Sequence, residues 1–267
     1  MIELLPLWAA ATLFLVLTMS AAWLVQWRTG QGGWADAFWS FGLGAAGVGV
    51  SLFPLHGAAP SARQVLAAVL IGLWGLRLGA HIARRAANER EDARYARLRH
   101  DWGSRFQTRM FGFLMLQAGA AAFLALSILL AARNPAPALG FQDGLAALIF
   151  LSALAGEGLA DHQLAAFKAD PVNRGLICDS GLWAWSRHPN YFFEWLGWCA
   201  WPLFAIDFGG DWPWGWLALS GPAYIYWLLT KVSGVPLLED HMKRSRPDAF
   251  AAYAAQTSAF FPRPPRR

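Results

Sequence analysis

The sequence predicts an all-α polytopic membrane protein, and three properties of the chain indicate this fold class. Of its 267 residues, 56% are hydrophobic and only 15% are charged, whereas soluble domains carry about 25% charged residues. The chain contains 16 Trp residues, and Trp favours the interface between membrane and water. Its apolar residues occur in long stretches, and about 20 such residues cross the hydrocarbon core as a helix.

Seven apolar stretches define the predicted membrane-spanning helices. They are residues 5–25, 38–55, 65–83, 111–132, 145–160, 191–206 and 214–229. The fifth and sixth are short or polar at their inner ends, so we expect them to form the walls of a polar cavity. The second contains four closely spaced glycines, which favour close helix packing in lipid.

The distribution of Lys and Arg predicts the orientation of the chain. With the N-terminus outside, the inner segments are residues 26–37, 84–110, 161–190 and 230–267, and they hold 19 of the 22 Lys and Arg residues. Positive residues collect on the cytoplasmic side of a membrane. We therefore expect the N-terminus outside and the C-terminus in the cytoplasm.

The start of the sixth predicted span is unusually polar. Arg187, His188, Asn190, Tyr191 and Glu194 all lie within eight residues. Ionisable groups at membrane depth are costly and usually face a functional cavity. Asn190 and Glu194 are one helical turn apart and so share a face, which indicates a polar ligand site here.

The end of the fifth predicted span carries a second polar pair, Glu157 and Asp161. Two helix ends with such pairs would grip an elongated ligand between them. Lys168 and Arg174 suit phosphate groups, because Arg gives bidentate hydrogen bonds and Lys a point charge. Carboxylates and amides suit ribose hydroxyls and a carboxamide. Taken singly, each of these residues is also typical of a solvated loop.

The C-terminal segment 230–267 forms a third polar group that includes Glu239, Asp240, His241 and Tyr253. Its apolar residues favour an amphipathic helix at the membrane surface. Attraction to anionic lipid explains its cations equally well. It explains the Glu239-Asp240-His241 run less easily.

A fourth set lies within the predicted spans. Asp36 stands at the mouth of the second span, Arg77 lies within the third, and His81 follows one turn later. A buried charge needs a partner, so Asp36 either pairs with Arg77 or takes part in catalysis. The Arg-rich segment 84–109 is interpreted mainly as a solvated, salt-bridged surface, with 88–95 as a candidate cap over the ligand site.

Several protein classes are excluded by missing motifs. The sequence has no Gly-x-Gly-x-x-Gly, P-loop, His-Glu-x-x-His or Gly-x-Ser-x-Gly motif, so we expect no Rossmann domain and no metal site. Cys178 and Cys199 imply no disulfide framework. The net charge of +5 is ordinary for cationic cytoplasmic loops, and we expect no nucleic-acid partner.

These residues belong to a longer pattern that resembles bacterial membrane proteins of the steroid 5-alpha-reductase superfamily. The matching segments are Asp36-Ala-Phe-Trp-Ser-Phe, Leu73-Trp-Gly-Leu-Arg-Leu-Gly-Ala-His, Glu91-Asp-Ala-Arg-Tyr, Gly181-Leu-Trp-Ala-Trp-Ser-Arg-His-Pro-Asn-Tyr and Tyr253-Ala-Ala-Gln-Thr-Ser-Ala-Phe-Phe-Pro. They cover most of the chain in the expected order. The Arg-His-Pro-x-Tyr box alone is also similar to isoprenylcysteine carboxyl methyltransferase-like membrane enzymes, which bind S-adenosylmethionine.

The resemblance implies one seven-helix reductase domain over residues 1–267, placed in a bacterial inner membrane. Such an enzyme uses NADPH to saturate a carbon–carbon double bond conjugated to a ketone, as in 3-oxo-4-ene steroids. Residues 1–132 would mainly form the pocket for a hydrophobic substrate that enters from membrane lipid. Residues 133–267 would mainly bind the cofactor from the cytoplasm.

The expected cofactor ligands follow from the motifs and the resemblance together. Asn190 and Glu194 match a cofactor-contacting pair of the family, and Asp161 and Lys168 match an Asp and a cation before it. The full expected set is Asp161, Lys168, Arg174, Arg187, His188, Asn190, Tyr191, Glu194, Glu239, His241 and Tyr253.

The resemblance leaves the residue that polarises the substrate ketone open. The eukaryotic enzymes use a Gln-Glu pair in span two and a Tyr in span three, but here the pair reads Asp36-Ala37 and span three has no Tyr. Either Asp36 acts, or Tyr226 or His81 supplies the donor. Hydride transfer leaves an enolate, and each preorganised donor to its oxygen is worth about 3 kcal/mol.

Two other function classes compete with the reductase. An S-adenosylmethionine-dependent membrane methyltransferase would need few cations, because its cofactor carries one carboxylate and a sulfonium. NADPH carries a diphosphate and a 2′-phosphate, so the cations at 168, 174, 187 and 243–246 favour NADPH. A non-enzymatic lipid-binding or scaffold protein would show no saturable nucleotide binding. The sequence predicts neither the natural substrate nor the oligomeric state.

Overall fold

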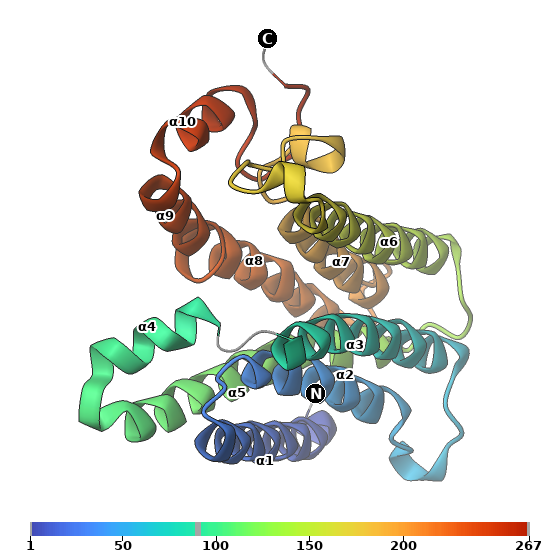
Figure 1. Cartoon of the computed structure of the whole chain (residues 1–267). Helices are drawn as coiled ribbons and strands as arrows, with labels where there is room; N and C mark the ends of the chain where they lie inside the picture. The colour runs from blue at the N-terminus through green and yellow to red at the C-terminus, as the bar shows by residue number, and fades with distance from the viewer. Residues whose placement is uncertain (1, 89–91, 266–267) are drawn as a thin grey trace. The chain divides into compact units, whose positions relative to one another are not determined.

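The computed structural model describes residues 2–88 and 92–265, and every regular element in these two ranges is helical (Figure 1). The chain divides into two compact units. Unit 1 comprises Met1–Gly140 and Phe204–Ala218, and unit 2 comprises Phe141–Leu203 and Leu219–Arg267. The predicted all-α fold class is confirmed for the described residues.

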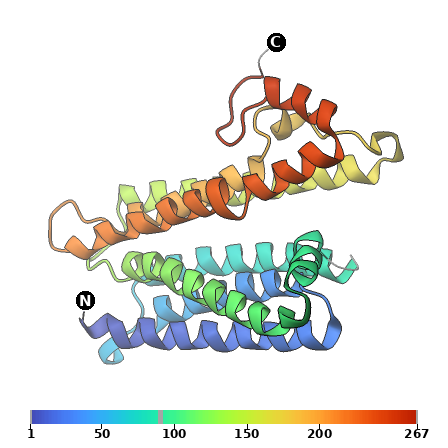
Figure 2. The ribbon, with the colours of Figure 1, turned by 90° about the vertical axis from the view of Figure 1, so that its left-hand side faces the viewer.

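Unit 1 contains four long helices that lie side by side (Figures 1 and 2). They are α1 (Leu5–Thr29), α2 (Trp34–Leu52), α3 (Ala62–Asn88) and α5 (Phe106–Ala132), with the short helix α4 (Ala93–Trp102) before α5. Short 3₁₀ turns cover Ile2–Leu4, Leu55–Gly57 and Gly103–Arg105, and a longer one covers Pro213–Leu219. Small and aliphatic side chains fill the interior of the bundle.

Helices α2 and α3 approach closely because glycines face each other where they pack. A Cβ atom at Gly44 would lie 2.9 Å from the Cα of Gly75, and one at Gly75 would lie 2.8 Å from the Cα of Gly44. Any side chain at either position would push the two backbones apart. The predicted packing role of the glycines in this helix therefore holds at Gly44.

Two arginines outside the predicted cytoplasmic segments also have structural roles in unit 1. Arg63 is buried and donates to backbone carbonyls of Asn134, Ala136 and Ala138. Arg133 donates to the carbonyls of Val50 and Phe53 over 2.8 and 2.7 Å. Both therefore bind carbonyl groups at or beyond helix ends, which a helix leaves unpaired.

Unit 2 is built on the antiparallel helices α6 (Phe141–Ala169) and α7 (Pro189–Ala205). The Phe150 and Trp201 rings pack edge to face at 5.4 Å between them. The remaining elements are α8 (Ser220–Trp227), a π-helical turn (Leu228–Val232), α9 (Val235–Ser245), α10 (Pro247–Gln256) and 3₁₀ turns at Pro171–Asn173 and Gly181–Ala184. The 3₁₀ turns connect α6 to α7.

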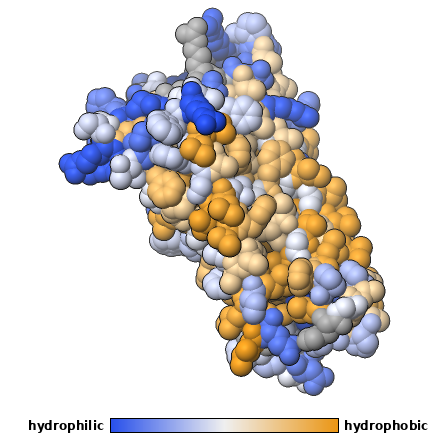
Figure 3. Space-filling model, turned by 90° about the horizontal axis from the view of Figure 1, so that it is seen from below, coloured by the Kyte–Doolittle hydropathy of each residue, from blue (hydrophilic) through white to orange (hydrophobic). Residues whose placement is uncertain are grey.

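Four helical stretches of the described chain are long and apolar enough to cross a membrane: Ile2–Thr29, Ala62–Asn88, Arg94–Ala132 and Phe141–Ala169. They correspond to the first, third, fourth and fifth predicted spans and mark the chain as membrane-integral. Figure 3 shows hydrophobic residues over much of the surface in view. The other three predicted positions hold α2, the 17-residue α7 and the helical run 213–232; seven spans stay a prediction.

Three segments differ from the sequence-based expectation. Helix α6 continues to Ala169 instead of ending near residue 160, so Asp161 and Lys168 lie on a helix and not in a loop. At 1.5 Å per residue its length is about 44 Å, which exceeds a hydrocarbon core of about 30 Å. The end of α6 therefore extends beyond the apolar layer that its middle would cross.

The Arg-rich segment is largely helical rather than an irregular loop. Helix α3 continues to Asn88, and α4 begins after Asp92, whose side chain caps the helix by accepting from the Arg94 N–H. The tail is also divided: α9 ends at Ser245 and α10 begins at Pro247. A residue before proline avoids the helical conformation, and Arg246 has φ −149° and ψ 62°, so one continuous tail helix is broken there.

Candidate functional site

One residue from each polar pair, on α6 and on α7, meets the other in unit 2. The Asn190 side-chain amide, in the first turn of α7, donates to Asp161 Oδ1 on α6 over 3.3 Å. One turn further along α7, Glu194 accepts a 2.8 Å hydrogen bond from the indole of Trp198. The structure thus brings together Asp161 and Asn190, which the sequence placed at two separate helix ends.

Arg187 lies just before α7, and its guanidinium group contacts other groups of the protein. Its Nε donates to Glu239 Oε1 over 2.8 Å, and its Nη2 lies 2.7 Å from the same oxygen. Its Nη1 donates to the carbonyl of Thr257 over 2.6 Å. Only 11% of the Arg187 side chain and 13% of the Glu239 side chain is exposed, so this is a largely buried ion pair.

His188 joins the same carboxylate. Its Nε2 lies 3.3 Å from Glu239 Oε1, and its ring stacks on Tyr191 with centroids 5.7 Å apart. We call Arg187, His188 and Glu239 the Arg187 network. It connects helix α9 to the segment that leads into α7.

The C-terminal motif packs around the segment 183–188. The Tyr253 hydroxyl donates to the Trp183 carbonyl over 2.6 Å. The Arg187 N–H donates to the Ser258 carbonyl, and the Ser186 hydroxyl to the Phe260 carbonyl, both over 2.8 Å. Two motifs that are about 70 residues apart in the sequence therefore form one structural element.

The Arg187 network determines the charge of Glu239. Burial raises the pKa of Glu239, but hydrogen bonds from His188 and Arg187 and the charges of both outweigh burial, so the pKa lies below its ordinary value. Glu239 is therefore a carboxylate at neutral pH. Burial also raises the pKa of the Tyr253 phenol, which stays a hydrogen-bond donor.

Three other expected cofactor ligands are exposed. Lys168 lies in the last turn of α6, Arg174 follows the Pro171–Asn173 turn, and His241 lies on α9. Their side chains are accessible to a ligand from outside unit 2. The Lys and Arg residues of the expected set thus divide into Arg187, which contacts Glu239, and the exposed Lys168 and Arg174.

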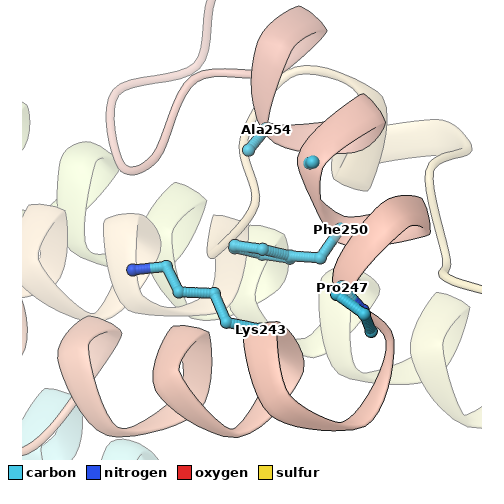
Figure 4. A pocket seen from close by; sticks show the side chains of 5 residues that line it. Lys243, Pro247, Phe250 and Ala254 are labelled. Carbon is cyan, nitrogen blue, oxygen red and sulfur yellow. The ribbon is translucent and has the colours of Figure 1, made fainter.

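A shallow pocket of about 270 Å³ adjoins the Arg187 network. It is lined by Lys243, Pro247, Phe250, Ala251 and Ala254. In Figure 4 the Phe250 side chain reaches from α10 toward Lys243 on α9. The Arg187 guanidinium carbon lies 5.7 Å from the centroid of the Phe250 ring, close enough for a cation–π contact.

A second polar cluster lies in unit 1, around Asp36 in the first turn of α2. Arg94 donates to Asp36 Oδ2 over 2.5 Å, and the Tyr95 hydroxyl donates to Asp36 Oδ1 over 2.8 Å. Arg94 also donates from Nε to Asp92 Oδ1 over 3.0 Å and from Nη2 to Asp92 Oδ2 over 2.9 Å. We call Asp36, Asp92, Arg94 and Tyr95 the Asp36 cluster.

The charge of Asp92 is fixed within this cluster. Burial raises the pKa of Asp92, but the hydrogen bonds and charge of Arg94, with a further contribution from Arg85, outweigh burial and lower it. Asp92 therefore stays ionised and orients Arg94 toward Asp36. The structure gives Asp36 a charged partner in Arg94, and the pairing of Asp36 with Arg77 stays a prediction.

Tyr95 is the donor that the sequence-based interpretation did not select. It is 3% exposed and packs in a core cluster with Ala22 and Ala35. A Cβ at Gly32 would lie 2.3 Å from Tyr95 Cγ, so the glycine makes room for the ring. The sequence analysis did not select Tyr95 because it interpreted residues 84–109 as a solvated surface. Tyr95 is nevertheless the last residue of the matching segment Glu91-Asp-Ala-Arg-Tyr, whose first residue lies outside the described residues.

The two donors proposed from the sequence lie elsewhere. His81 lies on α3 in unit 1, and Tyr226 lies on α8 in unit 2. Tyr226 packs against Trp195, Phe260 and Phe261, with ring centroids 5.4 to 6.0 Å apart. The hydroxyl that contacts Asp36 is therefore that of Tyr95, and the roles of His81 and Tyr226 stay predictions.

Comparison with known proteins places the chain in a family. A family model described as "Protein of unknown function (DUF1295)" matches residues 22–257, so the chain belongs to that family. No curated protein and no solved structure matches the chain. The matched range includes both the Asp36 cluster and the Arg187 network.

Proposed function

We propose that this DUF1295-family protein is an NADPH-dependent membrane reductase that saturates the carbon–carbon double bond of an enone, a 3-oxo-4-ene steroid-like lipid. The observation that carries the proposal is the hydrogen bond from the buried Tyr95 hydroxyl to Asp36. An enone reductase needs such a donor for the ketone oxygen, whereas methyl transfer to a thiol or carboxylate does not. The resemblance of the Asp36 and Glu91 segments to the reductase superfamily supports the same reading.

In this proposal the ketone oxygen of the substrate accepts a hydrogen bond from Tyr95. The tyrosine turns its only proton from Asp36 toward the ketone, and Asp36 keeps its ion pair with Arg94. The carboxylate therefore does not lose its last partner when the substrate binds. As the oxygen gains charge, a preorganised donor of this kind is worth about 3 kcal/mol in the transition state.

Unit 2 would bind the cofactor, which supplies a hydride when bound. The donor set fits a dinucleotide: the amide of Asn190 and the carboxylates of Asp161 and Glu194 suit ribose hydroxyls and a carboxamide. The exposed Lys168 and Arg174 suit phosphate groups. We place this site on the cytoplasmic face of a bacterial inner membrane, with the substrate entering from lipid.

The contacts of Arg187 with other protein groups support a second candidate function. All three of its guanidinium nitrogens contact protein acceptors, which leaves fewer cations for three phosphate groups. A cofactor with a single carboxylate would need fewer. This observation favours an S-adenosylmethionine-dependent methyltransferase of isoprenylcysteine type as the alternative.

Cofactor binding separates the two candidates. Detergent-purified protein would be titrated with NADPH, NADH and S-adenosylmethionine, and its thermal stability measured with each. The reductase proposal predicts saturable binding of NADPH and none of S-adenosylmethionine, and the reverse result would overturn it. Asn190→Ala and Glu194→Ala should each weaken NADPH binding about tenfold, the value of one or two hydrogen bonds, while Cys199→Ala on the same helix serves as the control.

A further inference from the structure

Three glutamines of unit 1 carry a side-chain oxygen that is buried without a hydrogen-bond partner among the described residues. They are Gln26 on α1 and Gln107 and Gln117 on α5. Such an oxygen destabilises the fold, because burial removes its water and no protein donor replaces it. The contacts of Gln117 distinguish it from the other two glutamines.

The Gln117 side chain contacts the Tyr95 hydroxyl through a hydrogen bond. Tyr95 gives its only proton to Asp36 Oδ1 over 2.8 Å, so its oxygen can only accept from Gln117. The donor is therefore the Gln117 Nε2–H, because the amide nitrogen is the donor end of this side chain. The amide oxygen is then the end that finds no partner in the described part of the chain.

Helix α2 holds the turn of α5 that carries Gln117. The indole N–H of Trp39 donates to the Gln117 backbone carbonyl over 3.1 Å, and Trp39 lies one helical turn after Asp36 on α2. Leu114, one turn before Gln117 on α5, packs in the core cluster that contains Tyr95. The same helix thus supplies the acceptor of the Tyr95 proton and a fixed contact to the turn of Gln117.

We propose that Gln117 is a positioning residue that holds the Tyr95 oxygen while the tyrosine donates its proton to the substrate ketone. The inference rests on the proposed function, because it assigns the ketone to Tyr95. When the Tyr95 proton turns to the ketone, the hydrogen bond to Asp36 is lost and the one from Gln117 remains. A donor to the phenol oxygen also strengthens the bond that the hydroxyl gives, because neighbouring hydrogen bonds polarise one another.

A positioning role predicts an effect on turnover that depends on the Tyr95 hydroxyl. Gln117→Leu should lower kcat for enone reduction about tenfold, the value of one hydrogen bond, and leave the KM for NADPH unchanged. In a Tyr95→Phe background the same change should alter kcat by no more than about twofold, since no hydroxyl is left to hold. A residue that only supports the core would lower kcat by the same factor in both backgrounds.

Gln107→Leu is the matched control. The Gln107 oxygen is also buried without a partner among the described residues, and its backbone carbonyl also accepts from an indole, that of Trp23, over 3.2 Å. Gln107 lies about 15 Å from Gln117 along α5, which is out of reach of the Tyr95 hydroxyl. The control should therefore keep the kcat of the intact protein.

The experiment measures kcat, KM and melting temperature with NADPH and a 3-oxo-4-ene steroid for the intact protein, each single variant and the double variant. Gln117→Leu and Gln107→Leu should melt no lower than the intact protein, because each removes a buried oxygen that lacks a partner in the described chain. Gln117→Met, which keeps the length of the side chain without its donor, is a second variant and should match Gln117→Leu in kcat.

Three results would overturn the positioning role alone: equal losses of kcat in the two backgrounds, an unchanged kcat in Gln117→Leu, or a lower melting temperature of both Gln117 variants than of Gln107→Leu. An intact protein that does not reduce the enone would overturn the proposed function together with it. The two failures are therefore distinguishable.

Discussion

Units 1 and 2 use their buried polar groups in different ways. In unit 2 the charged residues that the sequence singles out are bound to one another: Arg187 and His188 both contact Glu239. In unit 1 the Asp36 cluster is also paired, but the amide of Gln26 nearby has no partner within the described residues. The comparison indicates that polar groups in unit 2 hold the tail in place, whereas the Gln26 amide in unit 1 contributes no hydrogen bond to the described fold.

The largest expected effect comes from the donor in unit 1. Tyr95→Phe removes the hydroxyl from the ketone site, and losing one such donor lowers kcat by about 100-fold or more. The affinity for NADPH should not change, because the proposed cofactor residues lie in unit 2. Steady-state rates and NADPH titration of the purified variant measure both quantities.

Tyr226→Phe is the matched control for this change, since Tyr226 is one of the donors that the sequence left open and the other candidate tyrosine. It should keep the rate within a few-fold. If the turnover rate is kept in Tyr95→Phe but falls in Tyr226→Phe, the ketone donor is Tyr226 in unit 2. The difference drawn between the two units would then be wrong.

A change to the Arg187 network should act on stability. Glu239→Gln leaves the largely buried Arg187 without a charged partner, and breaking a buried ion pair costs about 3 kcal/mol. The melting temperature should fall, and limited proteolysis should release the segment after α9. Asp240→Asn, next to it, is the control: Asp240 is 61% exposed and 3.8 Å from Lys243, and an exposed pair is worth at most about 1 kcal/mol.

If both variants melt alike, the network contributes no more than a surface ion pair. The tail would then be held by its backbone hydrogen bonds, such as the one from Tyr253 to Trp183. That result would weaken the contrast drawn between the two units.

A somewhat smaller effect is expected at the α2–α3 contact. Gly44→Ala introduces a methyl group 2.9 Å from Gly75 Cα, and overpacking of this kind costs about 1–3 kcal/mol. Gly49→Ala is the control on the same helix, because a Cβ there meets nothing within 4 Å. Equal melting temperatures for the two variants would show that the close approach is not required.

The smallest effect is a dependence of stability on acid pH. The pKa of Glu239 lies below its ordinary value of about 4.3, so its contribution to stability is complete above that pH. It is lost as the pH falls through the lower value of the folded protein. Melting curves should therefore show an acid-induced loss below about pH 4 in the intact protein that is reduced in Glu239→Gln.

Local spacing made part of this fold and site predictable. Apolar stretches of the right length gave the helices, and the turn between Asn190 and Glu194 placed both on one face of α7. The sequence also indicated that the polar pairs on these two helices lie near each other, but not the direct hydrogen bond from Asn190 to Asp161. These relations depend on residues close in sequence or on consecutive helices.

Partners distant in sequence were not predictable in the same way. Glu239 lies 52 residues after Arg187, and nothing in their spacing indicates that they pair instead of binding phosphate. Tyr95 was not predicted because it lies in an Arg-rich segment, and such a segment is typical of a solvated surface. Only the structure shows that Asp36 and Gly32 lie beside it. Gln26 carries no motif at all, and only its complete burial makes it notable.

The most direct test of the central claim is the oxidation of NADPH by the purified protein, followed by absorbance, with a 3-oxo-4-ene steroid present and absent. The account predicts steroid-dependent NADPH oxidation with formation of the saturated ketone, and its loss in Tyr95→Phe. NADPH that is neither bound nor oxidised, together with saturable binding of S-adenosylmethionine, would contradict the account.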